Sequence, residues 1–394
     1  MIGRRGVLIG GGAFALALAG LGYRAWDRGV GSAGEGAAYE PWRTWEGVAD
    51  DGLLRPVRAA ILAANPHDTQ PWAFAVGPEA IEVFADRSRN LGSFDPFRRE
   101  MHLGLGAAIE NLSLAAGAHG LIAAVEPTQG ALTLSPDDAR FHAGRVVLRP
   151  ASPIRDELYA AIPARHTNRG PYRQDQPVGP DRLKRLQDLA ASDSARITFV
   201  ADAAARRDLG ELIVEATGRI VDDPEMSADS ARWFRVGARE IAAHRDGVTL
   251  DAAGLSPSMT ALAKFLPDMD AKTSDAYWLS MTRDSQVPTA PVLGMIFVRD
   301  RMDMPDAIAA GRAWQRLHLA ATVDGLAAQP LNQPVERVDR DAALGRPDTF
   351  GGALARFAPE PGWEATFVFR LGVPDRPAGP SPRRPLGDVA RIRM

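Results

Sequence analysis

Two short polar segments contain the residue types that could bind a polar or anionic small molecule. The first is LAANPHDTQPW at residues 62–72, where His67, Asp68, Thr69 and Gln70 stand between two prolines. Because proline restricts the backbone, such a turn holds its side chains in fixed positions. A carboxylate and an amide held in this way can hydrogen-bond the edge of a heterocycle that has both donors and acceptors.

The second polar segment, ARHTNRGPY at residues 164–172, contains Arg165, Thr167 and Arg169. A planar guanidinium can bind two phosphate oxygens at once, and a threonine hydroxyl adds another donor. Near the end of the chain, PSPRRPLGDV supplies a further pair of cations, Arg383 and Arg384. Two alternatives remain open: Arg165 and Arg169 could be surface arginines at a domain boundary, and Arg383 and Arg384 could be a solvated basic tail.

The composition excludes several classes of partner and site. The 46 basic and 49 acidic residues are interspersed and give a formal charge of -3, so nucleic acid is not an expected partner. The chain has no cysteine, which removes disulfides and thiolate metal ligands. Its seven histidines show no metal-binding spacing, so we predict no metal site and a structural, hydrogen-bonding role for His67.

An internal repeat predicts how the chain is organised. GAAIENLSLAAGAHGLIA, which begins at Gly106, returns as GRAWQRLHLAATVDGLAA at Gly311, with nine identities over eighteen positions. The apolar positions of each copy follow helical spacing, and Gly120 and Gly325 end the two helices. Strand-like runs such as AIEVFAD and VLGMIFVRD accompany each copy. A chance match in an alanine-rich chain is the alternative.

The predicted fold is therefore α+β, with two fused related halves that each contain helices and a mixed or antiparallel sheet. We expect the first half at residues 49–152 and the second at 153–394, with the surplus of the second half forming a helical lid at about 222–290. Residues 24–48 include GVGSAGEGAA, which is typical of a flexible linker.

The chain begins with a basic residue pair, Arg4 and Arg5, followed by an uncharged stretch up to Tyr23. Residues 1–23 are therefore predicted to be an export signal or an N-terminal anchor, and the arginine pair resembles a twin-arginine signal. The protein is expected in the periplasm or on the outer face of the cytoplasmic membrane. If the segment is retained, residues 6–23 could hold the protein at a membrane.

Four segments together resemble the FMN-dependent nitroreductase family. NPHDTQPW resembles the family's Asn-x-Gln-Pro-Trp turn, and ARHTNR resembles its Arg-x-Ser/Thr-x-Arg segment. AAQPLNQPVE at residues 327–336 resembles the backbone loop beneath the isoalloxazine ring, and PSPRRPLGDV resembles the basic segment for the FMN phosphate. The chain is similar to the double-length branch of the family, in which one polypeptide imitates both subunits of a dimer.

The resemblance implies FMN as cofactor and a monomer built as a pseudo-dimer. It implies hydride transfer through flavin N5, from NAD(P)H or another small donor to a nitroaromatic, quinone or similar acceptor, without a catalytic side chain. A protein that only sequesters FMN is the alternative, and a redox-inert relic of the fold is a third. The FMN-binding residues implied are His67, Asp68, Thr69, Gln70, Arg165, Thr167, Arg169, Pro330, Leu331, Asn332, Gln333, Arg383 and Arg384.

Two expectations follow from this comparison. The polar turn occurs only in the first half and the arginine segment only in the second, so the two should combine into a single FMN site per chain. Asp68 stands where the family usually has Asn, and an ionised carboxylate beside the flavin should lower its reduction potential.

Overall fold

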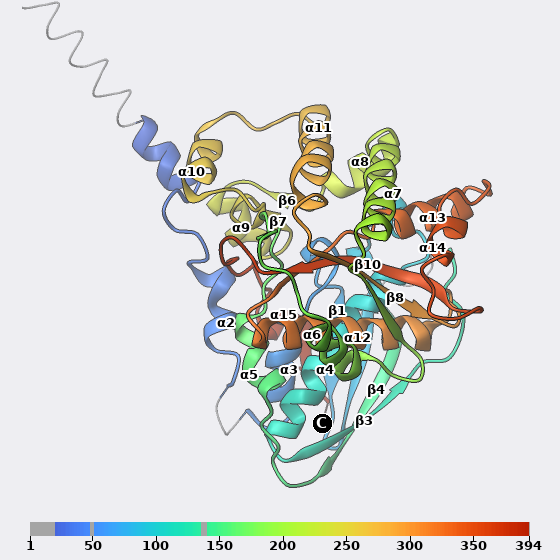
Figure 1. The fold of residues 1–394 in the computed structure, drawn as a ribbon. Coiled ribbons are helices and arrows are strands. Elements are labelled where there is room, and N and C mark those ends of the chain that lie inside the picture. The colour runs from blue at the N-terminus through green and yellow to red at the C-terminus, as the bar shows by residue number, and fades with distance from the viewer. Residues whose placement is uncertain (1–19, 48–50, 135–139, 394) are drawn as a thin grey trace, which may run out of the picture.

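The computed structural model describes residues 20–47, 51–134 and 140–393, and within them the strands form two main sheets (Figure 1). The first sheet has the order β11-β1-β2-β4-β3 and the second the order β5-β8-β10-β9. The strands are β1 (Trp72–Val76), β2 (Ala80–Asp86), β3 (Leu121–Pro127), β4 (Arg140–Pro150), β5 (Arg196–Val200), β8 (Val292–Val298), β9 (Ala327–Pro330), β10 (Glu364–Gly372) and β11 (Ala390–Ile392).

The two sheets repeat one arrangement. Four strands lie in the order β1-β2-β4-β3 in one sheet and β5-β8-β10-β9 in the other, and all neighbours within each set are antiparallel. Each set has a long helix before its third strand in chain order, α4 (Arg99–Ala118) and α12 (Met304–Val323). The parallel strand β11 joins the first sheet from the end of the chain, so that sheet is mixed. The predicted α+β class with mixed and antiparallel sheets is confirmed.

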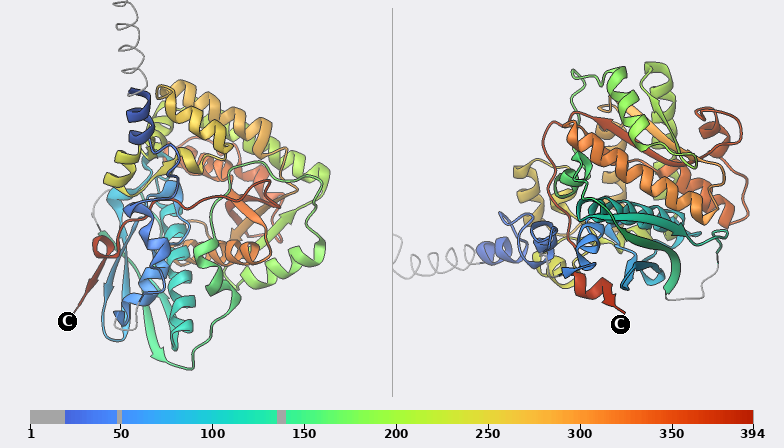
Figure 2. Two further views of the ribbon diagram at one scale, coloured as in Figure 1. Left: turned by 90° about the vertical axis from the view of Figure 1, so that its left-hand side faces the viewer. Right: turned by 90° about the horizontal axis from the view of Figure 1, so that it is seen from below.

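The repeated helices α4 and α12 pack against each other (Figure 2, right). A methyl group added to Gly106 would clash with the carbonyl oxygen of Ile308, and one added to Gly311 would clash with that of Leu103. Because 103 and 308 differ by the same 205 residues as 106 and 311, the two contacts are reciprocal. Reciprocal contacts are the signature of a two-fold interface, here within one chain.

Polar pairs extend this reciprocity along the helices. The buried Glu110 carboxylate accepts hydrogen bonds from Arg312 and Arg316, each at 2.9 Å. The side chain of Gln315 donates to the Asn111 side chain at 2.8 Å. Since Gln315 and Arg316 are the repeat counterparts of Glu110 and Asn111, each residue binds the counterpart of its neighbour. The pairs fix the register of the crossing.

The surplus of the second half lies between β5 and β8, at residues 201–291. The corresponding strands of the first half, β1 and β2, are joined by residues 77–79 alone. The predicted helical insertion is thus placed in an expanded hairpin connection, and Figure 1 shows it above the second sheet. It contains α7 (Ala203–Val221), α8 (Pro224–Ala231), β6 (Phe234–Arg235), α9 (Ala238–His244), β7 (Val248–Thr249), α10 (Pro257–Phe265) and α11 (Ala271–Met281).

The expected flexible linker at residues 24–48 is instead packed against the protein at α2 (Glu40–Arg43). Tyr39 and Trp42 are buried, and the Trp42 indole donates to the Ser381 carbonyl at 2.8 Å. The backbone amide of Arg383 donates to the Ala38 carbonyl at 2.7 Å. The prediction relied on the glycine-rich run and did not weigh these two aromatic residues. Their burial stabilises an ordered segment.

The remaining helices surround this frame. They are α3 (Leu54–Ala60), α5 (Glu157–Ala161), α6 (Pro180–Ala190), α13 (Gln333–Ala343), α14 (Gly351–Ala355) and α15 (Leu386–Val389). Most of the predicted signal, residues 1–19, lies outside the described residues, so export stays a prediction. In the described parts of the chain, no helix has the length and apolar character needed to cross a membrane.

Candidate functional site

The turn before β1 is strained. His67, Asp68 and Gln70 have φ values of 45°, 55° and 51°, in the left-handed region that non-glycine residues avoid. Each such residue costs about 1–3 kcal/mol and persists only where its surroundings enforce it. Here the Asn65 side chain accepts a hydrogen bond from the backbone amide of Gln70 at 2.7 Å, and prolines flank the turn. Stored strain of this kind is typical of ligand sites.

Four segments far apart in the sequence line one pocket beside this turn. They come from the turn itself, from the arginine segment, from the insertion and from the chain's C-terminal part. Asp68 and Arg165, the two residues expected to meet across the halves, are both in its wall. The lining residues are Ala64, Asn65, Asp68, Arg165, His166, Thr167, Arg169, Gly247, Val248, Ala252, Gly379, Ser381 and Arg383.

The pocket wall has more positive than negative charge. Arg165 and Arg383 are buried, with 2% and 1% of their surfaces exposed. Asp68 is the single carboxylate among the lining residues that could balance their charge. Arg383 forms an ion pair with Asp68, whereas Arg165 donates to the Leu62 carbonyl at 3.0 Å. Arg169 donates to a backbone carbonyl of the insertion. Three guanidinium groups against one carboxylate leave a surplus of two positive charges.

The pKa values report the same imbalance. Burial, followed by repulsion from Arg383, lowers the pKa of Arg165 to about 9. Burial also lowers the pKa of Arg169 and that of Arg383. Burial lowers the pKa of His166 to about 3, so this ring adds no charge near neutral pH. Uncompensated buried cations cost free energy, which an anionic ligand would recover.

Three buried polar atoms at the pocket have no hydrogen-bond partner within the described residues: the Nε atoms of Arg165 and Arg383, and Oδ2 of Asp68. Buried polar atoms are nearly always paired in folded proteins, so unpaired ones call for a ligand or water. A dianion with several acceptor oxygens, such as a phosphate monoester, fits both the unpaired donors and the charge surplus. Thr167 adds a hydroxyl to the same wall.

Asp68 should make the ligand-free protein pH-dependent. Burial outweighs the opposing effect of Arg383 and raises the pKa of Asp68 from 3.8 to about 6. The folded state therefore binds the proton more tightly than the unfolded state, and this group lowers the free energy of unfolding as pH rises from about 4 to about 6. In the Asp68→Asn variant, this decrease in the free energy of unfolding, on the order of 2–3 kcal/mol between about pH 4 and 6, should be absent. Urea unfolding of both FMN-free proteins across pH 4–6.5 checks this, and parallel profiles would contradict it.

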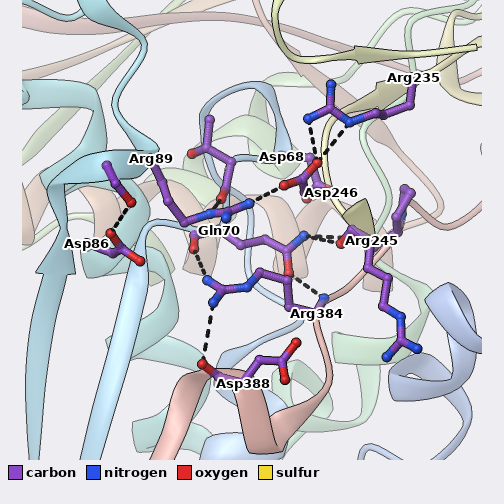
Figure 3. A network of polar contacts seen from close by, with 12 residues as sticks. Asp68, Gln70, Asp86, Arg89, Arg235, Arg245, Asp246, Arg384 and Asp388 are labelled. Carbon is purple, nitrogen blue, oxygen red and sulfur yellow. Dashed lines mark hydrogen bonds and ion pairs between the residues drawn. The ribbon is translucent and has the colours of Figure 1, made fainter. Parts of the chain in front are cut away.

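Gln70 and Arg384 are not among the residues that line the pocket, and Figure 3 shows how their side chains lie. The Gln70 amide donates to the Arg245 carbonyl at 2.9 Å, and its oxygen accepts from the Arg384 backbone amide at 2.7 Å. The Arg384 guanidinium reaches the carbonyls of Gln70 and Asp388, both at 3.4 Å. The side chains of these two residues hydrogen-bond backbone groups, and these bonds join the C-terminal segment to the turn.

Two further predicted residues of the turn also lie outside the lining. His67 bonds the Ser230 hydroxyl at 3.0 Å and packs edge-on against Phe94. Burial lowers the pKa of His67 to about 4, as a neutral structural histidine requires. Thr69 is fully buried, and its carbonyl accepts a hydrogen bond from Arg89.

The loop Pro330, Leu331, Asn332 and Gln333 does not line the pocket either. The Leu331 amide donates to the Val368 carbonyl at 2.9 Å, and the Val368 amide donates to the Asn332 side chain at 3.0 Å. The family resemblance implies the backbone of Leu331 to Gln333 as a donor toward flavin N5, but the Leu331 amide is used to extend the pairing of β10. Sequence similarity could not show this competition for the amide.

Two residues that contact Arg383, Trp42 and Ser381, were not among the predicted site residues. The Arg383 guanidinium lies 4.8 Å from the centre of the Trp42 ring, and Trp42 meets the His166 ring edge-on at 4.7 Å. Ser381 accepts a hydrogen bond from Arg383 at 2.6 Å. The aromatic residues Tyr39, Trp42 and Trp45, which follow a glycine-rich region, were the signal that could have identified this contact.

Comparisons with known proteins agree with the proposed resemblance. No protein-family model matches the chain. The chain is 26% identical over 342 residues, 84% of its length and 88% of the relative's, to "Putative NAD(P)H nitroreductase Rv3131" of Mycobacterium tuberculosis. It is 30% identical over 159 residues, 39% of its length and 46% of the relative's, to "Putative NAD(P)H nitroreductase acg" of the same species.

Solved structures give a weaker likeness. The FMN-dependent nitroreductase NfnB from Mycobacterium smegmatis in complex with NADPH has a TM-score of 0.39 and 21% identity, covering 60% of this chain and 98% of that one. A nitroreductase from Anabaena variabilis has a TM-score of 0.42 and 13% identity, covering 75% and 69%. Neither value bears on the site. What the comparisons establish is that this chain is similar, over most of its length, to a mycobacterial protein named as an NAD(P)H nitroreductase.

Proposed function

We propose that this protein is an FMN-dependent oxidoreductase of the nitroreductase type that holds one FMN per chain. The observation that carries the proposal is the pocket between the two halves, where three arginines face one carboxylate. A flavin phosphate has nearly two negative charges near neutral pH, which matches the surplus of the pocket. The similarity to an NAD(P)H nitroreductase over 84% of the chain supports the same cofactor class.

The residues of the chain have distinct tasks in this proposal. Arg165, Arg169 and Thr167 bind the phosphate, while Arg383 is held by its ion pair with Asp68. FMN supplies hydride transfer between a donor, NAD(P)H or another small molecule, and an acceptor such as a nitroaromatic or a quinone. Gly247 and Val248 of the insertion form part of the pocket wall, so the insertion limits the access of water to the cofactor on that side.

A second function, FMN sequestration without turnover, is favoured by one observation. The Gly247 amide of the insertion donates to the Asp68 carbonyl at 3.1 Å, so the insertion is bonded directly to the turn at the pocket. An insertion fixed in this way could hinder a second substrate from reaching the cofactor. Both functions share the pocket and differ in whether an electron donor gains access.

Anaerobic mixing of the FMN-loaded protein with NADH or NADPH separates the two functions. The oxidoreductase predicts bleaching of the visible flavin band by one of the two donors, followed by recovery with a quinone or nitroaromatic. A band that persists with both nicotinamides but bleaches with dithionite supports sequestration. A protein that takes up no FMN at all would contradict both.

A further inference from the structure

Helix α10 of the insertion has its apolar and polar faces reversed. Within Pro257–Phe265 the buried side chain is Lys264, which is 4% exposed. Met259 and Leu262 are 52% and 51% exposed, and Leu266, just after the helix, is 53% exposed. Positions 259, 262 and 266 follow the i, i+3, i+7 spacing, so these three side chains lie on one face.

Lys264 explains how this orientation is kept. Its ammonium group donates to the carboxylate of Asp251 and to the carbonyl of Gly29, both at 2.9 Å. Gly29 lies in the N-terminal segment and Asp251 in the insertion, so the buried lysine joins the two. A buried ammonium with two such partners fixes α10 and leaves the opposite face in solvent.

The N-terminal segment adds to the same surface. Residues 20–27 are helical and lie beside the C-terminal end of α10 (Figure 1). The Arg24 guanidinium binds the carbonyls of Phe265 and Leu266 at 2.9 and 2.6 Å. Arg28 forms an ion pair with Asp268 at 2.8 Å. Arg24 thus attaches this helix to the C-terminal end of α10, and Arg28 binds the segment after α10.

Three large side chains of the N-terminal helix are more than half exposed, and the Arg239 guanidinium lies 5.7 and 5.3 Å from the ring centres of Tyr23 and Trp26. Leu21, Tyr23 and Trp26 are 52%, 56% and 66% exposed. Together with the exposed face of α10 they form what we call the N-terminal apolar patch: Leu21, Tyr23, Trp26, Met259, Leu262 and Leu266. Monomeric proteins rarely leave several large apolar side chains together in water, and such patches mark protein or membrane contacts.

We propose that the N-terminal apolar patch rests on the surface of a lipid bilayer. The sequence from Gly6 to Tyr23 has no charged residue, and it leads directly into the patch at Leu21. Arg4 and Arg5 precede it, as basic residues that bind lipid headgroups do. Tyr and Trp are the side chains that favour the boundary between headgroups and acyl chains.

Arg24, Arg28 and Lys264 fasten the backbone that carries the patch side chains. An apolar surface that is ordered before contact loses little conformational entropy on binding, so less of the free energy gained by burying its apolar area is offset. The patch should therefore add to any membrane affinity of the preceding residues. Substitutions on α10, which leave residues 1–23 unchanged, test the folded surface by itself.

The test is flotation of the purified full-length chain with vesicles of phosphatidylcholine and phosphatidylglycerol. The patch variant combines Met259→Glu, Leu262→Glu and Leu266→Glu. The control variant combines Ile122→Glu, Ile154→Glu and Ile392→Glu, three side chains that are 61%, 67% and 66% exposed in other parts of the molecule. We expect the patch variant to bind vesicles at least about tenfold more weakly than the wild type, and the control about twofold or less.

Three results would overturn the proposal: no vesicle binding by the wild-type chain, an equal loss in both variants, or a dimer that the patch variant dissociates while vesicle binding is unchanged. Unaltered FMN affinity and thermal midpoint in the patch variant show that it is folded. These readouts do not depend on electron transfer, so failure here leaves the proposed oxidoreductase function untouched.

Discussion

Arg165→Met is expected to bind FMN at least about 100-fold more weakly and yet to make the FMN-free protein more stable. Two charge-assisted hydrogen bonds to a phosphate contribute about 1.5–3 kcal/mol each, and about 1.4 kcal/mol is a factor of ten. Without ligand, Arg165 is a buried cation with no carboxylate of its own and Arg383 nearby. Its removal should raise the free energy of unfolding by about 1–3 kcal/mol.

Isothermal titration with FMN and urea unfolding of the FMN-free proteins measure the two effects. Arg384→Met is the matched control, because Arg384 lies next to Arg383 but binds backbone carbonyls outside the pocket. Its FMN affinity should stay within about threefold of the wild type. If Arg165→Met kept wild-type affinity, or destabilised the FMN-free protein, the assignment of Arg165 to the phosphate would be wrong.

Gly311→Ala should destabilise the protein by about 3 kcal/mol or more. A methyl group at this position would meet the Leu103 backbone, which cannot move without separating α4 from α12. Gly106→Ala faces the reciprocal clash with Ile308 and should have a similar effect. Since the pocket contains residues of both halves, separation of the helices should weaken FMN binding as well.

The control for this prediction is Gly218→Ala. Gly218 lies in α7, and a methyl group there would contact nothing within 4 Å. Because alanine favours helices, this variant should be more stable by about 0.5–1 kcal/mol. Urea unfolding at one pH compares the three glycine variants. Equal effects of Gly311→Ala and Gly218→Ala would show that the helix crossing is not the point of close contact.

The sequence contained the main elements of this architecture because they depend on local patterns. The 205-residue offset of Gly106 and Gly311 predicted two related helices, and the glycines lie where those helices cross. The shared site of the proline-flanked turn and the arginine segment was predicted from the family resemblance rather than from a local pattern, and Asp68 and Arg165 line one pocket. Trp72, the first residue of β1, is fully buried.

Other parts of the site depend on tertiary contacts that a sequence pattern does not contain. Gln70 is a residue type that often contacts ligands, but its side-chain amide donates to the carbonyls of Arg245 and Pro382. Trp42 belongs to a segment that the sequence predicted to be flexible. In the structure its indole donates to the Ser381 carbonyl, which holds the segment in place. Hydrogen bonds between residues more than 170 positions apart decide both cases.

The structure also changes the expectation for Asp68. Its carboxylate is paired with Arg383, so much of its charge is compensated before any flavin binds. The expected decrease in reduction potential is correspondingly smaller than for an isolated carboxylate, although its direction is the same. The main role of Asp68 in this arrangement is to hold Arg383 at the pocket.

The central claim is that the two halves of one chain together hold a single FMN. Its most direct test is the molar ratio of flavin to polypeptide after saturation with FMN and removal of the excess, measured by flavin absorbance against amino-acid analysis. The account predicts a ratio of about one in the wild type and near zero in Arg165→Met under the same wash. A ratio of two, or one flavin retained by Arg165→Met, would contradict it.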